Sequence, residues 1–164
     1  APSAMARFNA ETPMNPAVRY GSVVIQGRPP SWRSAIELGL APTSHGSYGL
    51  YRALYLLAAQ MQSSEVPQPD RAQQETLARF FGEVPDIAAN DGIVPTLSQI
   101  HGELVHLAWA DHLDVVGHFG DARTNPPHVE WVTSRSNFEL EDFRTLWQRA
   151  AGFLLESGQG NDAQ

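Results

Sequence analysis

Two segments with the composition of β-strands lie far apart in the chain, and helical patterns dominate the sequence between them. Residues 18–25 are rich in Val, Ile and Tyr and lie between Pro16 and a Gly-Arg-Pro-Pro turn. Residues 103–109 form a second apolar run, interrupted by His106. At 164 residues, the chain has the length of one domain, or of a piece of one.

Three longer segments have the pattern of a helix. Residues 48–62 are apolar, with leucines at helical spacing, and residues 71–81 follow a Pro-rich loop with Asp70 as the cap. The last helix is expected to begin at a capping box of Ser136 and Glu139 and to end at Gly158. Three weaker predictions are short helices at 3–9 and 113–119 and an extended piece at 129–132.

The apolar helix at 48–62 has two interpretations. Leu50, Leu54 and Leu57 recur at helical spacing, with Tyr51 and Tyr55 beside them. Such a stripe is most often packed into the core of a protein. The alternative is a cap or lid over a substrate pocket. Both interpretations stay open on the sequence alone.

Charge and composition exclude several classes of protein. The 164 residues include 11 Arg, no Lys and 18 acidic residues, for a net charge of −7, so the chain lacks the basic surface of a nucleic-acid-binding protein. The absence of Cys excludes disulfide scaffolds, zinc–thiolate sites and cysteine nucleophiles. No apolar run is long enough to span a bilayer. Because Ala1 follows no Met or leader peptide, we expect the chain to begin inside a longer protein.

Two short polar segments lie where the predicted strands should end. One is Asn-Asp-Gly-Ile-Val-Pro, which contains Asp91, and the other is Trp-Ala-Asp-His-Leu-Asp, which contains His112. A carboxylate and a histidine at one edge of a sheet are two members of an acyl-transfer triad, in which the histidine moves a proton and the carboxylate orients it. The alternatives are a turn-forming Asp91 and a structural His112.

These two segments resemble the acid and histidine loops of α/β-hydrolases, specifically bacterial lipases and lipase-like esterases. That family commonly has an Asn-Asp-Gly-Ile/Leu/Val-Val turn around its acid and a His-Leu-Asp triplet that begins with its histidine. The stretches at 6–10 and 18–22 and the closing helix with Trp147 and Arg149 are also similar to the family. The resemblance covers residues 3–25 and 88–156.

The resemblance implies the α/β class, with a mainly parallel sheet flanked by helices. It makes residues 1–156 the C-terminal portion of one α/β-hydrolase domain, with a helical insertion at 26–87 and a polar tail at 157–164. It makes Asp91 the triad acid and His112 the triad histidine. The nucleophile is not matched, because the family's serine lies in a G-x-S-x-G elbow N-terminal to both residues, and this sequence has no such motif. Ser47, in Gly-Ser-Tyr-Gly, is the nearest approach, but its spacing is wrong.

Asp114 invites a prediction of calcium. In several relatives of this family, an aspartate two residues after the histidine binds calcium, and Asp70 lies at a suitable distance before Asp91 to supply a second carboxylate. Otherwise Asp114 is an acid in the first turn of a helix, and Asp111 caps that helix. No cofactor is expected to be required.

The leading hypothesis is therefore a secreted carboxylic ester hydrolase that degrades lipids, acting on an apolar ester and completed by an N-terminal segment with the serine. A polyester depolymerase or a thioesterase would use the same triad. A protein of another class, a catalytically silent α/β-hydrolase-like protein that binds a ligand or partner, is the alternative that the missing elbow favours.

Overall fold

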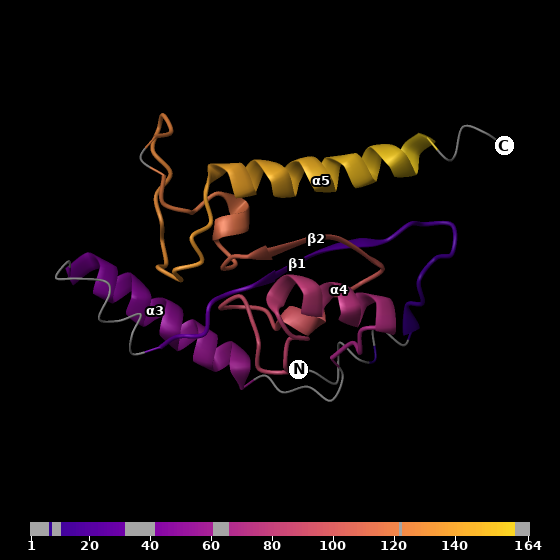
Figure 1. The fold of residues 1–164 in the computed structure, drawn as a ribbon, viewed down its shortest axis with the longest axis horizontal. Coiled ribbons are helices and arrows are strands. Elements are labelled where there is room, and N and C mark those ends of the chain that lie inside the picture. The colour runs from indigo at the N-terminus through magenta and orange to yellow at the C-terminus, as the bar shows by residue number, and fades with distance from the viewer. Residues whose placement is uncertain (1–6, 8–10, 32–41, 61–65, 122, 160–164) are drawn as a thin grey trace.

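The computed structural model describes residue 7 and residues 11–31, 42–60, 66–121 and 123–159. In these ranges it contains a two-stranded sheet and three helices (Figure 1). The elements, in chain order, are β1 (Gly21–Gln26), α3 (Pro42–Ala59), α4 (Arg71–Phe81), the 3₁₀ turn η1 (Thr96–Gln99), β2 (Glu103–Trp109), the 3₁₀ turn η2 (Asp114–Val116) and α5 (Leu140–Gln159). The short helix expected at 3–9 lies outside the described residues, apart from Arg7.

The two strands pair in parallel, which confirms the predicted α/β class. Register runs from Gly21 opposite Glu103 to Gln26 opposite Trp109, with one irregularity between Ser22 and Val23. Both strand predictions are confirmed, although β1 begins three residues later than expected. Because the strands are parallel, their carboxyl ends lie at the same edge of the sheet, where ligand sites of α/β proteins gather.

Helices cover the two faces of this sheet (Figure 1). On one face, Val24 and Leu107 pack with Leu77 of α4 and with apolar residues of η1. On the other face, Ile25 and Ala108 pack with Leu146 of α5. Covering both faces is what a parallel sheet requires, since its strands are apolar on both sides.

Helix α4 matches its prediction at both ends. The Asp70 carboxylate accepts a hydrogen bond from the Gln73 N–H at 2.9 Å, and the Gln73 side chain accepts one from the Asp70 N–H at 2.9 Å. This reciprocal capping box satisfies two N–H groups that would otherwise lack partners. At the other end, Gly82 adopts a left-handed φ of 91° and closes the helix.

Helix α3 buries its tyrosines rather than its leucines. Tyr51 is 1% exposed, and Tyr48 and Tyr55 are also buried, whereas Leu50 is 51% exposed and Leu57 is 61% exposed. The tyrosine face packs against Val132, and the Tyr51 hydroxyl donates to the carbonyl oxygen of Arg28 at 2.8 Å. Core packing of this helix is therefore confirmed for its tyrosines and wrong for Leu50 and Leu57, because the neighbouring loops offer carbonyl acceptors that tyrosine can use and leucine cannot.

Three local predictions in the last third of the chain are wrong. Residues 113–119 form only the 3₁₀ turn η2, closed by Gly117 at a φ of 98°, and residues 129–132 form no strand. Helix α5 begins at Leu140, and its first turn is capped by Asp142, whose carboxylate accepts from the Glu139 N–H at 2.9 Å. The Ser136 hydroxyl oxygen accepts from the Phe138 N–H at 3.2 Å and not from the Glu139 N–H, so the predicted capping box does not form.

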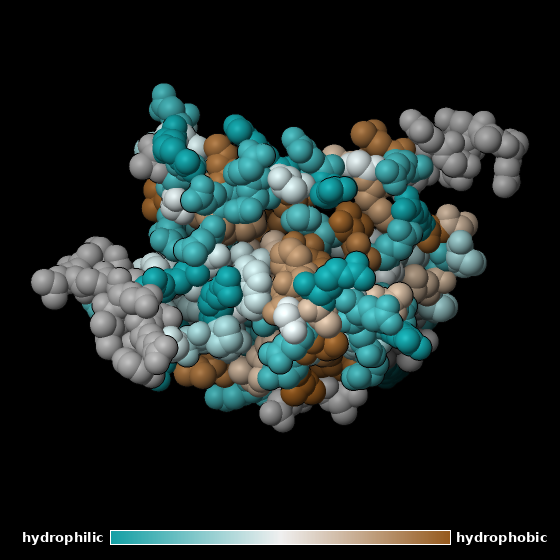
Figure 2. Space-filling view, in the orientation of Figure 1, coloured by the Kyte–Doolittle hydropathy of each residue, from teal (hydrophilic) through white to brown (hydrophobic). Residues whose placement is uncertain are grey.

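The end of α5 and the surface differ in smaller ways from expectation. The helix continues to Gln159, so it includes the start of the predicted tail at 157–164, and 160–164 lie outside the described residues. Apolar side chains reach the surface among polar ones (Figure 2). Within the described ranges, no helix combines the length and apolar character needed to cross a membrane.

Candidate functional site

Asp91 lies in a turn that is tied to the end of β1. The N–H of Gly27, the residue after β1, donates to the carbonyl oxygen of Asn90 at 2.9 Å. The Asn90 side chain is fully buried, donates to the carbonyl oxygen of Tyr55 at 3.1 Å and accepts from the N–H of Gly92 at 2.8 Å. The Asn-Asp-Gly segment therefore joins the turn to both β1 and α3.

Gly92 is required by the shape of this turn. Its φ is 96°, a left-handed conformation that glycine adopts without strain. A Cβ atom at this position would lie 3.2 Å from the ring of Tyr51. Conformation and crowding thus both favour glycine after Asp91.

The Asp91 carboxylate is surrounded by hydrogen-bond donors. Its Oδ1 accepts from the backbone N–H groups of Ile93 and Val94 at 2.9 and 2.7 Å. Its Oδ2 faces His112 Nδ1 at 2.9 Å and accepts from the Gln99 side-chain amide at 3.3 Å. Asp91 is only 1% exposed, so these donors replace water around the carboxylate.

His112 follows β2 and is held to Asp91 by two bonds. Its N–H donates to the Asp91 carbonyl oxygen at 2.9 Å, in addition to the contact through Nδ1. Because a carboxylate only accepts, Nδ1 carries the proton in the neutral ring and Nε2 keeps its lone pair. The side chain is 40% exposed, so one edge of the ring is accessible. The structure thus brings together the two residues singled out from the sequence as an acid–histidine pair.

Asp111 and Asp114 flank His112 and bind one another's backbone. Asp111 Oδ1 accepts from the N–H of Leu113 at 2.8 Å and from that of Asp114 at 3.1 Å. In return, Asp114 Oδ2 accepts from the Asp111 N–H at 2.9 Å and from the Ser136 hydroxyl at 2.7 Å. The reciprocal bonds close a short turn around the histidine.

The two carboxyl groups of this turn are buried, at 1% and 2% exposure for Asp111 and Asp114. Burial and the negative charge of Asp111 raise the pKa of Asp114 to about 8. Burial is also the main reason that the pKa of Asp111 is raised. At neutral pH the pair therefore retains a proton, because two adjacent buried carboxylates cannot both stay charged.

The described residues do not form a calcium site around Asp114. Calcium takes six to eight oxygen ligands, including ionised carboxylates, whereas Asp114 Oδ2 already accepts from two protein donors. The second predicted ligand, Asp70, caps α4 instead. In the described part of the chain, no three acidic, histidine or cysteine side chains are grouped to hold a metal ion. Calcium binding at Asp114 stays a prediction without structural support.

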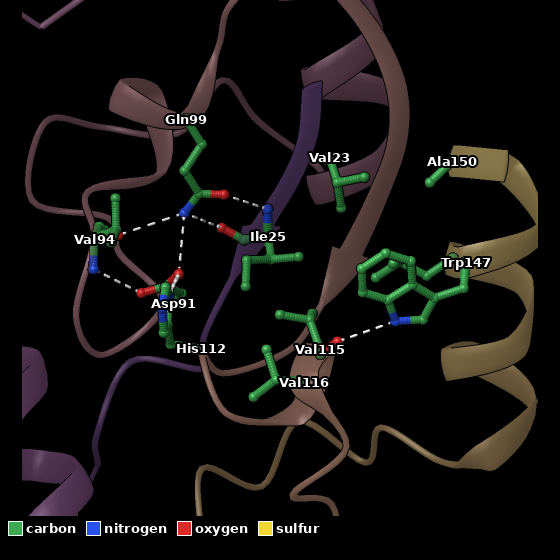
Figure 3. A pocket seen from close by; sticks show the side chains of 11 residues that line it. Val23, Ile25, Asp91, Val94, Gln99, His112, Val115, Val116, Trp147 and Ala150 are labelled. Atoms are coloured by element: carbon green, nitrogen blue, oxygen red, sulfur yellow. Dashed lines mark hydrogen bonds and ion pairs between the residues drawn. The ribbon is translucent and has the colours of Figure 1, made fainter. Parts of the chain in front are cut away.

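An apolar cavity of about 340 Å³ opens beside the Asp91–His112 pair. Figure 3 shows Asp91, His112 and Gln99 at one side of it and Trp147 and Ala150 of α5 at the other. The remaining lining is aliphatic and comes from β1, the turn before η1, η2 and α5: Val23, Ile25, Val94, Val115, Val116 and Leu146. Apart from the site residues, the cavity walls offer contacts for an apolar group.

Ser47 is not placed as the nucleophile of this pair. It lies inside α3, not on a strand-to-helix turn, and its hydroxyl is 2.7 Å from that of Thr133. In the described residues, no serine hydroxyl is hydrogen-bonded to His112 Nε2. The structure thus contains an acid and a histidine in contact, and among the described serines none is bonded to the free nitrogen of that histidine.

Two features of the site were not predicted from the sequence. One is Gln99, which lies eight residues after Asp91 and reaches back to its carboxylate. The other is the exchange of hydrogen bonds between Asp111 and Asp114, for which an Asp-x-x-Asp spacing was the available signal.

Searches of known protein families, curated proteins and solved structures found no match to this chain.

Proposed function

We propose that this chain supplies the acid and the histidine of a Ser-His-Asp triad in a carboxylic ester hydrolase of the α/β-hydrolase type. The observation that carries the proposal is the 2.9 Å contact between Asp91 Oδ2 and His112 Nδ1. The carboxylate is buried and held by backbone N–H groups, while the histidine remains partly exposed. This is the arrangement that an acid–histidine pair needs to act on a third group.

In this mechanism, His112 Nε2 removes a proton from a serine hydroxyl as its oxygen attacks the ester carbonyl carbon. The imidazolium then gives that proton to the departing alcohol as the ester bond breaks. A water molecule, activated by the same nitrogen, hydrolyses the acyl-serine. Asp91 stays ionised throughout, orients the ring and stabilises its positive charge.

The cavity favours an apolar ester as substrate. Its aliphatic and indole walls lie beside the partly exposed ring of His112, and the described lining residues carry no ionisable side chain besides Asp91 and His112. An acyl chain that enters the cavity would lose contact with water and bring its carbonyl group near the histidine.

The serine in this proposal belongs to a segment outside this chain. Two strands are few for an independent sheet, and in the described residues β1 pairs with β2 at one edge, while at its other edge the N–H and C=O of Ile25 are bound by the Gln99 amide. A further parallel strand that pairs with the part of this edge before Ile25 would bring the end of a central strand, with its serine elbow, toward His112.

The decisive experiment compares residues 1–164 with a protein that also contains the encoded upstream segment. We expect the shorter chain to be poorly folded and to have no p-nitrophenyl ester turnover. The longer protein should hydrolyse these esters and react with a fluorophosphonate probe at one serine. Turnover and probe labelling of residues 1–164 alone would contradict the proposal and indicate an internal serine.

The absence of a serine elbow favours a second candidate, a catalytically silent protein of the same fold that binds an apolar ligand in the cavity. An upstream sequence without G-x-S-x-G, and a longer protein that takes up a fluorescent fatty acid without turnover, would establish this candidate. A polyester depolymerase or a thioesterase would share the triad, and the ester and thioester substrates distinguish these activities.

The lid interpretation of α3 is tested separately. Leu50 is half exposed, so its replacement by Ser should change stability little. If α3 contacts substrate, Leu50→Ser in the active protein lowers turnover of emulsified long-chain esters more than that of soluble short esters. Equal effects on both substrates would assign α3 to the scaffold.

A further inference from the structure

Gln99 links three parts of the candidate site through one side-chain amide. Its Oε1 accepts from the N–H of Ile25 in β1 at 2.7 Å, and its Nε2 lies 3.2 Å from the Ile25 carbonyl oxygen. The same Nε2 lies 3.3 Å from Asp91 Oδ2 and 3.5 Å from the Val94 carbonyl oxygen. Figure 3 shows this amide between β1 and the Asp91 turn.

We propose that Gln99 is a positioning residue, which holds the Asp91 carboxylate in the orientation that meets the His112 ring. The inference rests on the proposed function, because it assigns a part in that reaction to a residue that touches neither the serine nor the scissile bond.

The choice of carboxylate oxygen supports this assignment. Asp91 Oδ1 is already held by two backbone N–H groups, so the orientation of the carboxylate around that oxygen depends on what Oδ2 meets. Two groups meet Oδ2, the His112 ring and the Gln99 amide. When His112 moves to exchange a proton, the amide remains as a donor that keeps Oδ2 in place.

The anchor of Gln99 is rigid. Ile25 is nearly fully buried in a paired strand, and the register directs its backbone N–H and C=O away from β2. The Gln99 amide binds both groups, as the backbone of an adjacent strand would. Through Gln99, the position of Asp91 Oδ2 is therefore fixed by the sheet as well as by its own loop.

A structural role for Gln99 alone would be to fasten η1 to β1. Two substitutions separate the two roles. Gln99→Glu keeps an oxygen to accept from the Ile25 N–H but replaces the donor to Asp91 with a carboxylate oxygen. Gln99→Met keeps the length of the side chain and removes both functions. Gln148→Glu, at an exposed position of α5, adds the same charge away from the site and is the matched control.

These variants are compared in the active, full-length protein by kcat, KM, melting temperature and the NMR resonance of the His112 Nδ1–H, which His112→Ala identifies. Loss of a partner that orients a functional histidine or carboxylate typically costs about 10- to 100-fold in activity. We expect kcat to fall about 10-fold in Gln99→Met and about 100-fold in Gln99→Glu at pH 8, with KM within about twofold. The His112 resonance should move in both variants, and Gln148→Glu should match the wild type.

A pH profile gives the sharpest distinction. In Gln99→Glu, the introduced carboxyl group regains a donor when it is protonated, so the loss of kcat relative to wild type should shrink as the pH is lowered from about 8 to about 6. Gln99→Met has no such group, and its loss should stay constant. The positioning role would be overturned if the loss of kcat simply followed the drop in melting temperature. In that case Gln99→Met would lose more kcat than Gln99→Glu, and neither loss would depend on pH.

The outcomes also separate this inference from the proposed function. If the full-length protein has no esterase activity but the His112 resonance still moves in both Gln99 variants, the hydrolase proposal fails and Gln99 still positions the pair. If the protein is active, and both the resonance and kcat are unchanged in Gln99→Glu, the hydrolase proposal stands and the role of Gln99 is wrong.

Discussion

Asp91 and the Asp111–Asp114 pair place the same chemical group on two sides of His112 in opposite surroundings. All three aspartates are 2% exposed or less. Asp91 meets two backbone N–H groups, an amide and the histidine ring. Asp111 and Asp114 accept from backbone N–H groups of their own turn, Ser136 donates to Asp114, and the negative charge of Asp111 acts on Asp114.

The difference shows how partners decide what a buried carboxyl group can do. A carboxylate with four donors exchanges its hydration for protein hydrogen bonds and can stabilise a positive ring beside it. Two adjacent carboxyl groups in the same environment repel each other when both are charged, so the pair holds a proton and serves to shape the turn. The charge beside His112 is therefore assigned to Asp91.

The largest expected effect separates these two roles by activity. Asp91→Asn keeps size and turn propensity but removes the charge that stabilises the imidazolium and fixes the tautomer. In the active protein, kcat should fall about 10³- to 10⁴-fold while the melting temperature changes little. Steady-state kinetics and thermal unfolding measure the two quantities.

Asp111→Asn is the matched control for that substitution. It is adjacent to His112 in sequence and equally buried, but its carboxyl faces backbone N–H groups and Asp114. Its effect on kcat should be less than about tenfold. If Asp111→Asn abolished activity while Asp91→Asn left it intact, the assignment of the acid would be wrong.

A second prediction concerns stability and pH. The pKa of Asp114 is about 8 in the folded protein against 3.8 for an unperturbed aspartate, so the folded state retains a proton that the unfolded chain has released between these values. Its contribution to stability is therefore complete below about pH 4 and is lost as the pH rises through 8. Asp114→Asn, which mimics the neutral form, should reduce the fall in unfolding free energy between about pH 5 and pH 8 by about 3–4 kcal/mol.

Asp121→Asn is the control of opposite sign. Hydrogen bonds from Arg123 lower the pKa of Asp121, so its contribution is present above the unfolded pKa and is lost as the pH falls through the folded value. Denaturant titrations at several pH values compare the two variants. If the unfolding free energy of Asp114→Asn depends on pH in the same way as that of the wild type, the proton assigned to the Asp111–Asp114 pair would be wrong.

A third prediction tests the rigidity of the Asp91 turn. Gly92→Ala should destabilise the protein by about 2 kcal/mol, because it combines a left-handed φ with contact against the Tyr51 ring. Gly82→Ala carries a similar φ of 91° in open space and should cost only about 1 kcal/mol. Equal losses in chemical denaturation would show that the ring does not confine the turn.

The smallest effect belongs to the support of the Asp111–Asp114 turn. Ser136→Ala removes the donor to Asp114 Oδ2 and should cost about 1 kcal/mol in unfolding free energy. Ser98→Ala, which removes an exposed hydroxyl bonded to a carbonyl, should cost less than about 0.5 kcal/mol. If Ser136→Ala loses no more unfolding free energy than Ser98→Ala, the Asp111–Asp114 turn is stable without the Ser136 hydroxyl.

The predictions from sequence were accurate where the residues that make the stabilising contact lie close together in the chain. The cap of α4 needs only Asp70 and Gln73, three residues apart, and the position of the capping residue, Asp70, was predicted correctly. The face of α3 depends on carbonyl oxygens of residues 28 and 31, and there the leucine stripe was misleading. Ser136 was assigned to a local cap, yet its hydroxyl donates to Asp114, 22 residues earlier.

By itself, the sequence determined where the two strands and helix α4 lie, and it identified Asp91 and His112 as candidate site residues. Composition and short-range spacing are enough for these predictions. Only the tertiary structure decided that Gln99 and His112 meet the same oxygen of Asp91, and that Asp111 and Asp114 exchange hydrogen bonds in one turn. Hydrogen bonds to a buried carboxyl group are chosen among all donors that the fold brings within about 3 Å. Some of these donors, such as His112 for Asp91 and Ser136 for Asp114, lie 21 and 22 residues away along the chain.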